Sequence, residues 1–350
     1  MARRAVYGTA ALIGLAAVVY SAAWWVAADR FRGELDGWAA DMRGRGWSVS
    51  YDLARIEGYP ASLTAVVEVP SIGAPEKAGG WRWRGPRMTA KVQPWNFGRI
   101  ALDGAGDHRF QAGGADEDPV RVAMGNAFGL VLRLADAEAT KIVLRLGDIA
   151  IDAPGGTLPR RVEDAEATVL LPDRPGRADA GRGPEPAGPT VTLGLRDVDF
   201  GEAASGGRLR AIDEASLTAK LIGPLPRGAT ATSLAVWRDG GGTLEIGEVS
   251  LRSGKTKGKG SGTVALDRNL QPLAALSIRV EGYADLVRSL VAHGWLTGRD
   301  AGAIRLGLDL FARASTGQPG TVALPITVQN RRLFLGPISA MRLPPIEWGK

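Results

Sequence analysis

The chain has no cysteine and only two histidines among its 350 residues. Without cysteine it can form neither a disulfide nor a thiolate-bound metal site, and an oxidising compartment remains compatible with this composition. His108 and His293 are too few for a histidine-based metal site unless distant carboxylates complete it. The sequence therefore predicts no metal site and no disulfide framework.

Motifs that carry catalysis or hold a cofactor are also scarce. Gly254-Lys255-Thr256 resembles the end of a phosphate-binding loop, but that loop needs glycine where this chain has Val249. We interpret residues 253–262 as a flexible basic hairpin tip between two strands. No Gly-x-Ser-x-Gly elbow occurs, and a pair of distant carboxylates for glycoside hydrolysis stays open. We therefore expect no catalytic and no cofactor-binding residue, and a protein that is not an enzyme.

Charge is not concentrated in runs, although the net charge is +6. The 43 basic residues are interspersed with 37 acidic ones, which favours a mildly basic surface over a nucleic-acid footprint. Hydrophobic residues make up 45% of the chain, as is typical of a folded globular protein. We expect no nucleic-acid partner.

One stretch lacks charge altogether: the 24 residues from Ala5 to Ala28, preceded by Arg3 and Arg4. At about 1.5 Å per residue a helix of this length reaches roughly 36 Å, against a hydrocarbon core of about 30 Å. Residues 1–28 therefore predict a single-pass membrane anchor, with Trp24 and Trp25 in the headgroup region. The alternative is a signal peptide cleaved near residues 21–23.

The distribution of charge around this anchor does not by itself determine its orientation. Arg3 and Arg4 favour a cytoplasmic N-terminus, but arginines also follow the span, at positions 30, 32, 43 and 45. We expect the N-terminus inside and the main body in the periplasm, because a short basic start before an apolar run resembles an export signal.

Residues 29–46 predict an amphipathic helix. Phe31, Leu35, Trp38 and Met42 recur at helical spacing on one face. This face lies either on the membrane surface or on the following domain, and the pattern fits both.

From Trp47 onward the apolar period changes from helical to two. Alternating runs that predict antiparallel strands are centred on Leu193, Ile278, Leu308 (304–310) and Leu324. A phase slip near Gly247 predicts a β-bulge. One internal helix is predicted at about 284–296. The fold class is mostly β, either a curved antiparallel sheet or a sandwich, with the anchor and one or two further helices.

Residues 172–189 interrupt the β pattern. This Pro- and Gly-rich segment has no aliphatic side chain larger than alanine, so it predicts a disordered loop. It divides the body into a first β-region, 47–171, and a second, 190–350.

Tryptophan is concentrated in one part of the first β-region. Trp81 and Trp83 share one face of a strand, and Trp95 follows soon after. Such a face either binds a sugar ring or a lipid or covers one edge of the sheet core.

These aromatic residues belong to a longer pattern. It consists of Ile56-Glu-Gly-Tyr-Pro60, Trp81-Arg-Trp83, Val92-Gln-Pro-Trp95, Leu333-Phe-Leu-Gly-Pro337 and Leu343-Pro-Pro-Ile346. The pattern resembles the Domain of Unknown Function 2125 family of Gram-negative bacteria, although Tyr59 stands where that family usually has phenylalanine. The middle portion, from Val236-Trp237 to residues 260–267, is similar to AsmA-like envelope proteins. The family supplies no catalytic residues to carry over.

The resemblance implies a membrane-anchored periplasmic β-structure whose curved sheet presents an apolar groove to lipid. We therefore predict a non-enzymatic inner-membrane protein that binds or helps to transfer lipid, or supports envelope assembly. The alternative is a scaffolding module that recruits another envelope protein. The expected partners are the inner membrane, a lipid and other envelope proteins, and the ligand-binding residues stay unknown.

Overall fold

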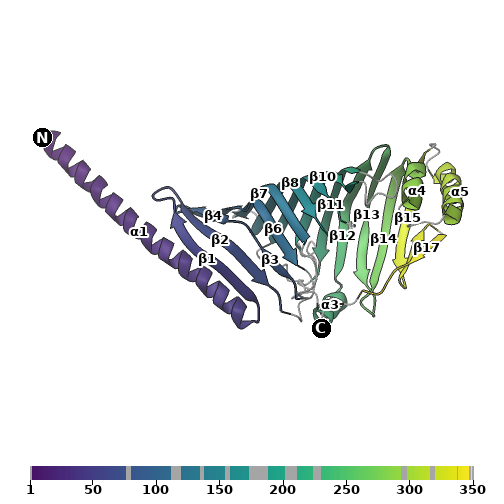
Figure 1. Ribbon diagram of the computed structural model, residues 1–350, viewed down its shortest axis with the longest axis horizontal. Coiled ribbons are helices and arrows are strands. Elements are labelled where there is room, and N and C mark those ends of the chain that lie inside the picture. Colours follow the sequence, from purple (N-terminus) through teal and green to yellow (C-terminus); the bar gives the residue numbers. More distant parts are fainter. Residues whose placement is uncertain are drawn as a thin grey trace, which may run out of the picture.

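The computed structural model describes residues 2–75, 80–111, 120–134, 138–153, 158–172, 188–201, 211–223, 230–292, 298–315, 320–336, 338–346 and 348. In the first helix, side chains are described from Ala17 onward. Of the loop predicted at 172–189, residues 173–187 lie outside these residues. The molecule is elongated, with one long helix projecting from one end of a large sheet (Figure 1).

Helix α1 runs without a break from Ala2 to Gly44, through both the predicted anchor and the predicted amphipathic helix. Residues 5–16 of the predicted span lie outside the described side chains. No helix among the described residues is long and apolar enough to cross a membrane.

The second half of α1 packs on the sheet along one helical stripe. The residues of this stripe are Trp24, Ala28, Phe31, Leu35, Ala39 and Met42. One expectation was wrong in detail. Trp38 points to solvent, because Ala39 takes the buried position at that level of the helix. Trp24 is buried in the protein core, where its ring packs with Leu63 and Val92.

Among the described residues, seventeen strands form one large antiparallel sheet, which confirms the mostly β prediction. The first nine strands are β1 (Ser48–Glu57), β2 (Leu63–Gly73), β3 (Arg82–Arg84), β4 (Met88–Gln93), β5 (Asn96–Asp103), β6 (Gly106–Gln111), β7 (Val120–Leu134), β8 (Ala139–Asp152) and β9 (Arg161–Pro172). The remaining strands are β10 (Thr190–Asp199), β11 (Ala211–Ile222), β12 (Thr243–Ser253), β13 (Thr256–Leu266), β14 (Pro272–Glu281), β15 (Thr321–Gln329), β16 (Arg332–Leu335) and β17 (Ile338–Arg342).

From β7 onward each strand pairs with the next one along the chain. Near the N-terminal end, β2 pairs with both β3 and β4, which continue through β6 and β5 to β7. Strands β9 and β10 pair from Thr190↔Leu170 to Asp199↔Arg161. The two β-regions on either side of 172–189 thus share one sheet.

The part of the chain that the structure describes also contains helices α3 (Ala231–Asp239), α4 (Tyr283–Ala292) and α5 (Gly298–Ser315). Helix α4 lies where an internal helix was expected, and residues 293–296 of that expectation lie outside the described part of the chain. The strand predicted at 304–310 was wrong, because these residues belong to α5. Helix α3 was not predicted.

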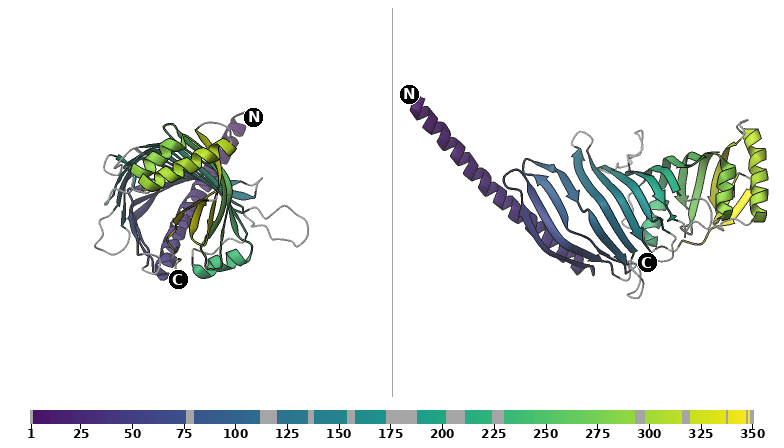
Figure 2. Two further views of the ribbon diagram at one scale, coloured as in Figure 1. Left: turned by 90° about the vertical axis from the view of Figure 1, so that its right-hand side faces the viewer. Right: turned by 45° about the horizontal axis from the view of Figure 1, so that its top comes forward.

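The sheet curves around the long axis of the molecule. In the end-on view the strands bend around the line along which α1 is seen (Figure 2). Glycines in β13 allow close approach of the neighbouring strand, since a Cβ on Gly260 would lie 2.7 Å from the Ser277 carbonyl oxygen.

The basic segment 253–262, which was expected to be a flexible hairpin tip, is mostly strand. Only Gly254 and Lys255 form the tip of the hairpin between β12 and β13. The predicted bulge at Gly247 is confirmed by the register shifts of β12.

A second irregularity crosses several strands at one level. The cross-strand pairing leaves out one residue in each strand at this level: Gly125 in β7, Asp148 in β8, Glu163 in β9 and Asp197 in β10. Asp148 and Asp197 have φ values of 52° and 49°, in the left-handed region that aspartate tolerates better than most residues. Leu146 packs on the same cluster as Ile149, although an odd spacing of three normally places side chains on opposite faces. The extra residue at this level therefore compensates for the odd spacing, so that the apolar side chains before and after it lie on one face of the sheet.

Candidate functional site

One face of the sheet is apolar over nearly its whole length. Cross-strand partners in an antiparallel sheet point to the same side, so the register identifies its rows. One row consists of Leu102, Gly129, Leu144, Ala167, Leu193, Leu217, Val249, Gly260, Ile278 and Leu324. The adjacent row consists of Ile100, Val131, Ile142, Val169, Val191, Ala219, Ile246, Gly262, Leu276 and Ile326. We call the side that carries these two rows the apolar face.

Helices cover both ends of the apolar face. At the N-terminal end, Trp24 and Ala28 of α1 pack on Leu63 and Val92, with Ile56 and Ile100 beside them. At the other end, Phe311 and Ala312 of α5 pack with Val322 and Leu324 of β15. Because α1 lies inside the curve of the sheet and packs on this face, the apolar face is the concave one.

Between its covered ends the apolar face carries exposed leucines. Leu102, Leu144, Leu193 and Leu195 retain 36%, 42%, 40% and 38% of their surface. These residues come from three strands, β5, β8 and β10, and three of them lie in the same cross-strand row. Exposed apolar side chains that line up on a concave surface are typical of a binding site for an apolar ligand.

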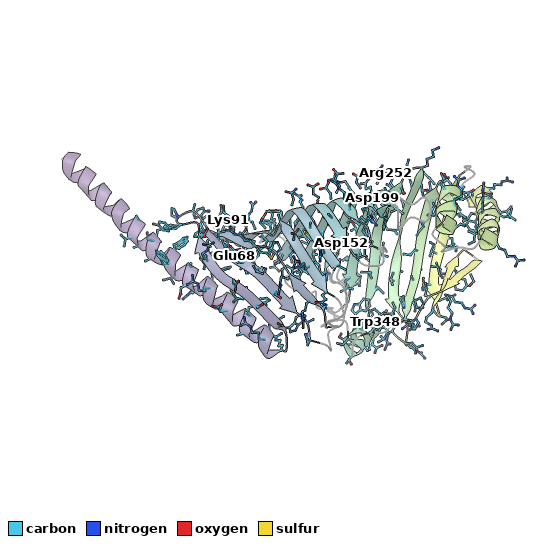
Figure 3. All side chains as sticks on the ribbon, in the orientation of Figure 1. Glu68, Lys91, Asp152, Asp199, Arg252 and Trp348 are labelled. Carbon is cyan, nitrogen blue, oxygen red and sulfur yellow. The ribbon has the colours of Figure 1, made fainter. Side chains whose placement is uncertain are left out.

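The opposite, convex face is charged. Ion pairs cross from strand to strand, with Arg145 and Glu166 3.4 Å apart, Arg196 and Asp164 2.8 Å apart, and Arg252 and Glu214 3.4 Å apart. Figure 3 shows side chains along the whole outer surface, with Arg252 and Asp199 labelled. A depression of about 510 Å³ lies over Gly194 on this face. The charged groups around it pair with one another, so it has the character of a solvated sheet surface.

His108 is a structural residue on the side of the sheet that also carries Val122. Its ring is buried, and its Nδ1 accepts a hydrogen bond from Trp83 Nε1 at 3.3 Å. Its Nε2 lies 2.8 Å from the Gly104 carbonyl oxygen. A neutral imidazole with the proton on Nε2 satisfies both contacts.

The structure separates the tryptophans of the first β-region. Trp83 stacks on His108 with ring centroids 5.9 Å apart, whereas Trp81 contacts Trp47 edge to face at 5.7 Å. Both therefore cover parts of the protein, and they form no continuous aromatic platform. Trp95 lies elsewhere and is exposed.

His293 lies outside the described part of the chain. Among the residues that the structure does describe, no group of three or more His, Asp or Glu side chains is placed to hold a metal ion.

The comparison with known families agrees with the motifs. A family model described as "Uncharacterized protein conserved in bacteria (DUF2125)" matches residues 24–344. The chain belongs to this family. The match begins at Trp24, the first described residue of α1 that is buried on the sheet, so the DUF2125 region coincides with the packed body. No curated protein and no solved structure matches the chain.

The sequence located part of this candidate site. Its period-two pattern identified Leu193 and Leu195 as members of one strand face. It could not place Leu102 and Leu144 beside them, because the partner of each strand depends on long-range pairing. The relation to AsmA-like proteins stays a prediction.

Proposed function

We propose that this DUF2125 protein is a membrane-anchored periplasmic protein that binds phospholipid through its apolar face. One observation carries the proposal: a row of leucines is exposed on the concave side of the sheet while both ends of the same face are covered by helices. Burial of an acyl chain on such a surface gains about 0.8 kcal/mol per methylene. The proposal includes no chemical reaction.

The anchor is part of this proposal. The uncharged run from Ala5 to Ala28 supports a single inner-membrane span with the N-terminus inside. Since α1 continues into the packed body without a break, the span would hold the sheet directly at the bilayer. A lipid that leaves the bilayer would then reach the exposed leucines past the end of the face that α1 covers.

Photocrosslinking in cells tests lipid binding. The photoreactive residue p-benzoylphenylalanine is placed at Leu193, which is 40% exposed on the apolar face, and in a matched variant at Leu170, which is 37% exposed on the charged face of the neighbouring strand. We expect position 193 to crosslink to phospholipid severalfold more than position 170. Equal crosslinking at the two positions, or none at 193, contradicts the proposal.

A scaffolding role remains the alternative, and one observation favours it. Leu306 and Leu310 lie one turn apart on α5 and are exposed. They lie outside the cluster that Leu308 and Phe311 form with β15, and they offer a small surface to another envelope protein. Under this alternative, a photoreactive group at Leu306 crosslinks to one dominant protein while position 193 crosslinks to no lipid.

A further inference from the structure

Exposed aromatic side chains gather at the end of the sheet where α1 leaves it. We define the aromatic rim as Trp25, Tyr59, Trp95 and Phe97, all of them more than half exposed. Tyr59 lies in the connection from β1 to β2, and Trp95 lies in the turn from β4 to β5. Because Leu63 pairs with Val92, the two connections are neighbours at one edge of the sheet.

Contacts with α1 join the helix to this edge. Tyr20 Oη donates a hydrogen bond to the Pro60 carbonyl oxygen, and the Ser21 and Tyr59 hydroxyl groups lie 2.6 Å apart. Trp24 packs edge to face on both Trp25 and Tyr59. A hollow of about 420 Å³ lies between the helix and the connection and is lined by Trp25 and Tyr59 among others. Figures 1 and 3 show the end of β4, beyond the labelled Lys91, beside the middle of α1.

The length of the free helix limits how far the rim can stand from a bilayer. Among the described side chains of α1, Tyr20 is the first with a hydrogen bond to the body, and residues 5–19 of the uncharged run precede it. At about 1.5 Å per residue they reach roughly 22 Å, which is less than the hydrocarbon thickness of about 30 Å. A bilayer that takes in the whole uncharged run must therefore reach the level of the rim.

The exposed side chains of α1 also indicate that the bilayer reaches the level of the rim. Val18, Val19, Trp25 and Val26 are exposed, and the first charged residues of the helix beyond them are Asp29 and Arg30. The apolar surface of α1 thus continues past Tyr20 to the level of the rim and ends there. Tryptophan and tyrosine are the residues that membrane proteins place at this boundary.

We infer that the aromatic rim sits in the headgroup region of the bilayer that holds α1, so that the helix-covered end of the apolar face lies next to the lipid. The inference rests on the proposed anchor and names the bilayer as the partner of this edge. Packing within the protein does not explain the four aromatic side chains, because more than half of the surface of each is exposed. Contact with the headgroup region would cover that exposed surface.

The absence of cysteine allows a direct test with single labels on the full chain. Separate Trp95→Cys, Val19→Cys and Val236→Cys variants carry the fluorophore NBD and are reconstituted into vesicles of phosphatidylcholine and phosphatidylglycerol. Val236 is the matched control, because it and Trp95 are each 64% exposed and Val236 lies on α3. Lipids brominated near the glycerol backbone serve as quenchers, and circular dichroism checks that each variant is folded.

We expect strong quenching at position 95, at least threefold more than at position 236. Quenching at 19 without quenching at 95 overturns the rim and leaves the anchor standing. Quenching at 95 without quenching at 19 overturns the anchor and, with it, the placement of the rim at a bilayer that holds α1. No quenching at either position overturns both, and lipid binding by the apolar face is judged separately by the crosslinking at Leu193.

Discussion

At the scale of single residues, two adjacent tryptophans have opposite roles. Trp24 is 3% exposed, and its indole N–H donates to the Ser62 carbonyl oxygen at 3.1 Å, whereas Trp25 is 68% exposed. The sequence could not separate them, because adjacent identical residues differ only in how the helix is rotated against the sheet. That rotation is set by the stripe from Trp24 to Met42, in which the small Ala28 and Ala39 allow close packing.

The pair gives a prediction about stability. Trp24→Ala should lower the free energy of unfolding by about 3–5 kcal/mol, because it leaves a cavity beside Leu63 and Val92. The matched Trp25→Ala should change it by less than about 0.5 kcal/mol. Urea unfolding of the full chain in detergent, followed by circular dichroism, measures both. Similar losses for the two variants would show that Trp24 is not a core residue.

At the scale of elements, α5 shows where sequence patterns are ambiguous. Ile304, Leu306, Leu308 and Leu310 alternate as in a strand, but Leu308 and Phe311 pack toward β15 while Leu306 and Leu310 are exposed. A helix with apolar residues on two sides produces the same alternation as a strand with one apolar face. The strands β10, β14 and β15 were predicted correctly, because their alternation matches a sheet with one polar side.

Helices α4 and α5 are joined by a hydrogen bond of 2.6 Å from the Tyr283 hydroxyl to Asp309. This bond raises the pKa of Tyr283 above its usual value, and burial and the negative charge of Asp309 add to the rise. A tyrosine whose pKa is higher in the folded state contributes stability below the unfolded value of about 10 and loses it as pH rises through the folded value.

A pH titration of stability tests this link. The unfolding midpoint of the native chain should fall more between pH 9 and pH 11.5 than that of Tyr283→Phe, which has no proton to lose. Asp309→Asn keeps an acceptor without the charge and should give an intermediate slope. Parallel curves for all three proteins would mean that the Tyr283–Asp309 bond does not contribute to stability.

At the scale of the whole molecule, β10 holds the two β-regions together. Gly194 lies in its middle, paired with Glu166 of β9 and Ser216 of β11. Gly194→Pro should destabilise the entire sheet by about 2 kcal/mol or more, because proline removes an N–H from the ladder. Gly194→Ala should be tolerated, since a Cβ there meets no atom within 4 Å.

The measurement is the thermal unfolding of both variants by circular dichroism. We expect one transition in each protein, with the proline variant shifted to lower temperature. Two separate transitions in the native chain would instead mean that residues 47–171 and 190–350 fold independently.

The class of the fold and the family could be predicted from the sequence, because alternation and short motifs are local properties. The curvature of the sheet could not be predicted. It depends on which strands become neighbours, such as β2 with β4 and β3 with β6, and on contacts such as those of Gly260. The exposed leucines are visible as a site only when that curvature is known.

The left-handed residues Asp148 and Asp197 restrict how the length of this chain can change during evolution. Loss of one residue at this level of β8 alone would shift Ile149 and Ile151 by one position against their partners in β7 and β9, because those strands each keep the extra residue. Length variation among homologues should therefore be confined to the connections between strands. The spacing across this row should be kept even where the residues themselves differ.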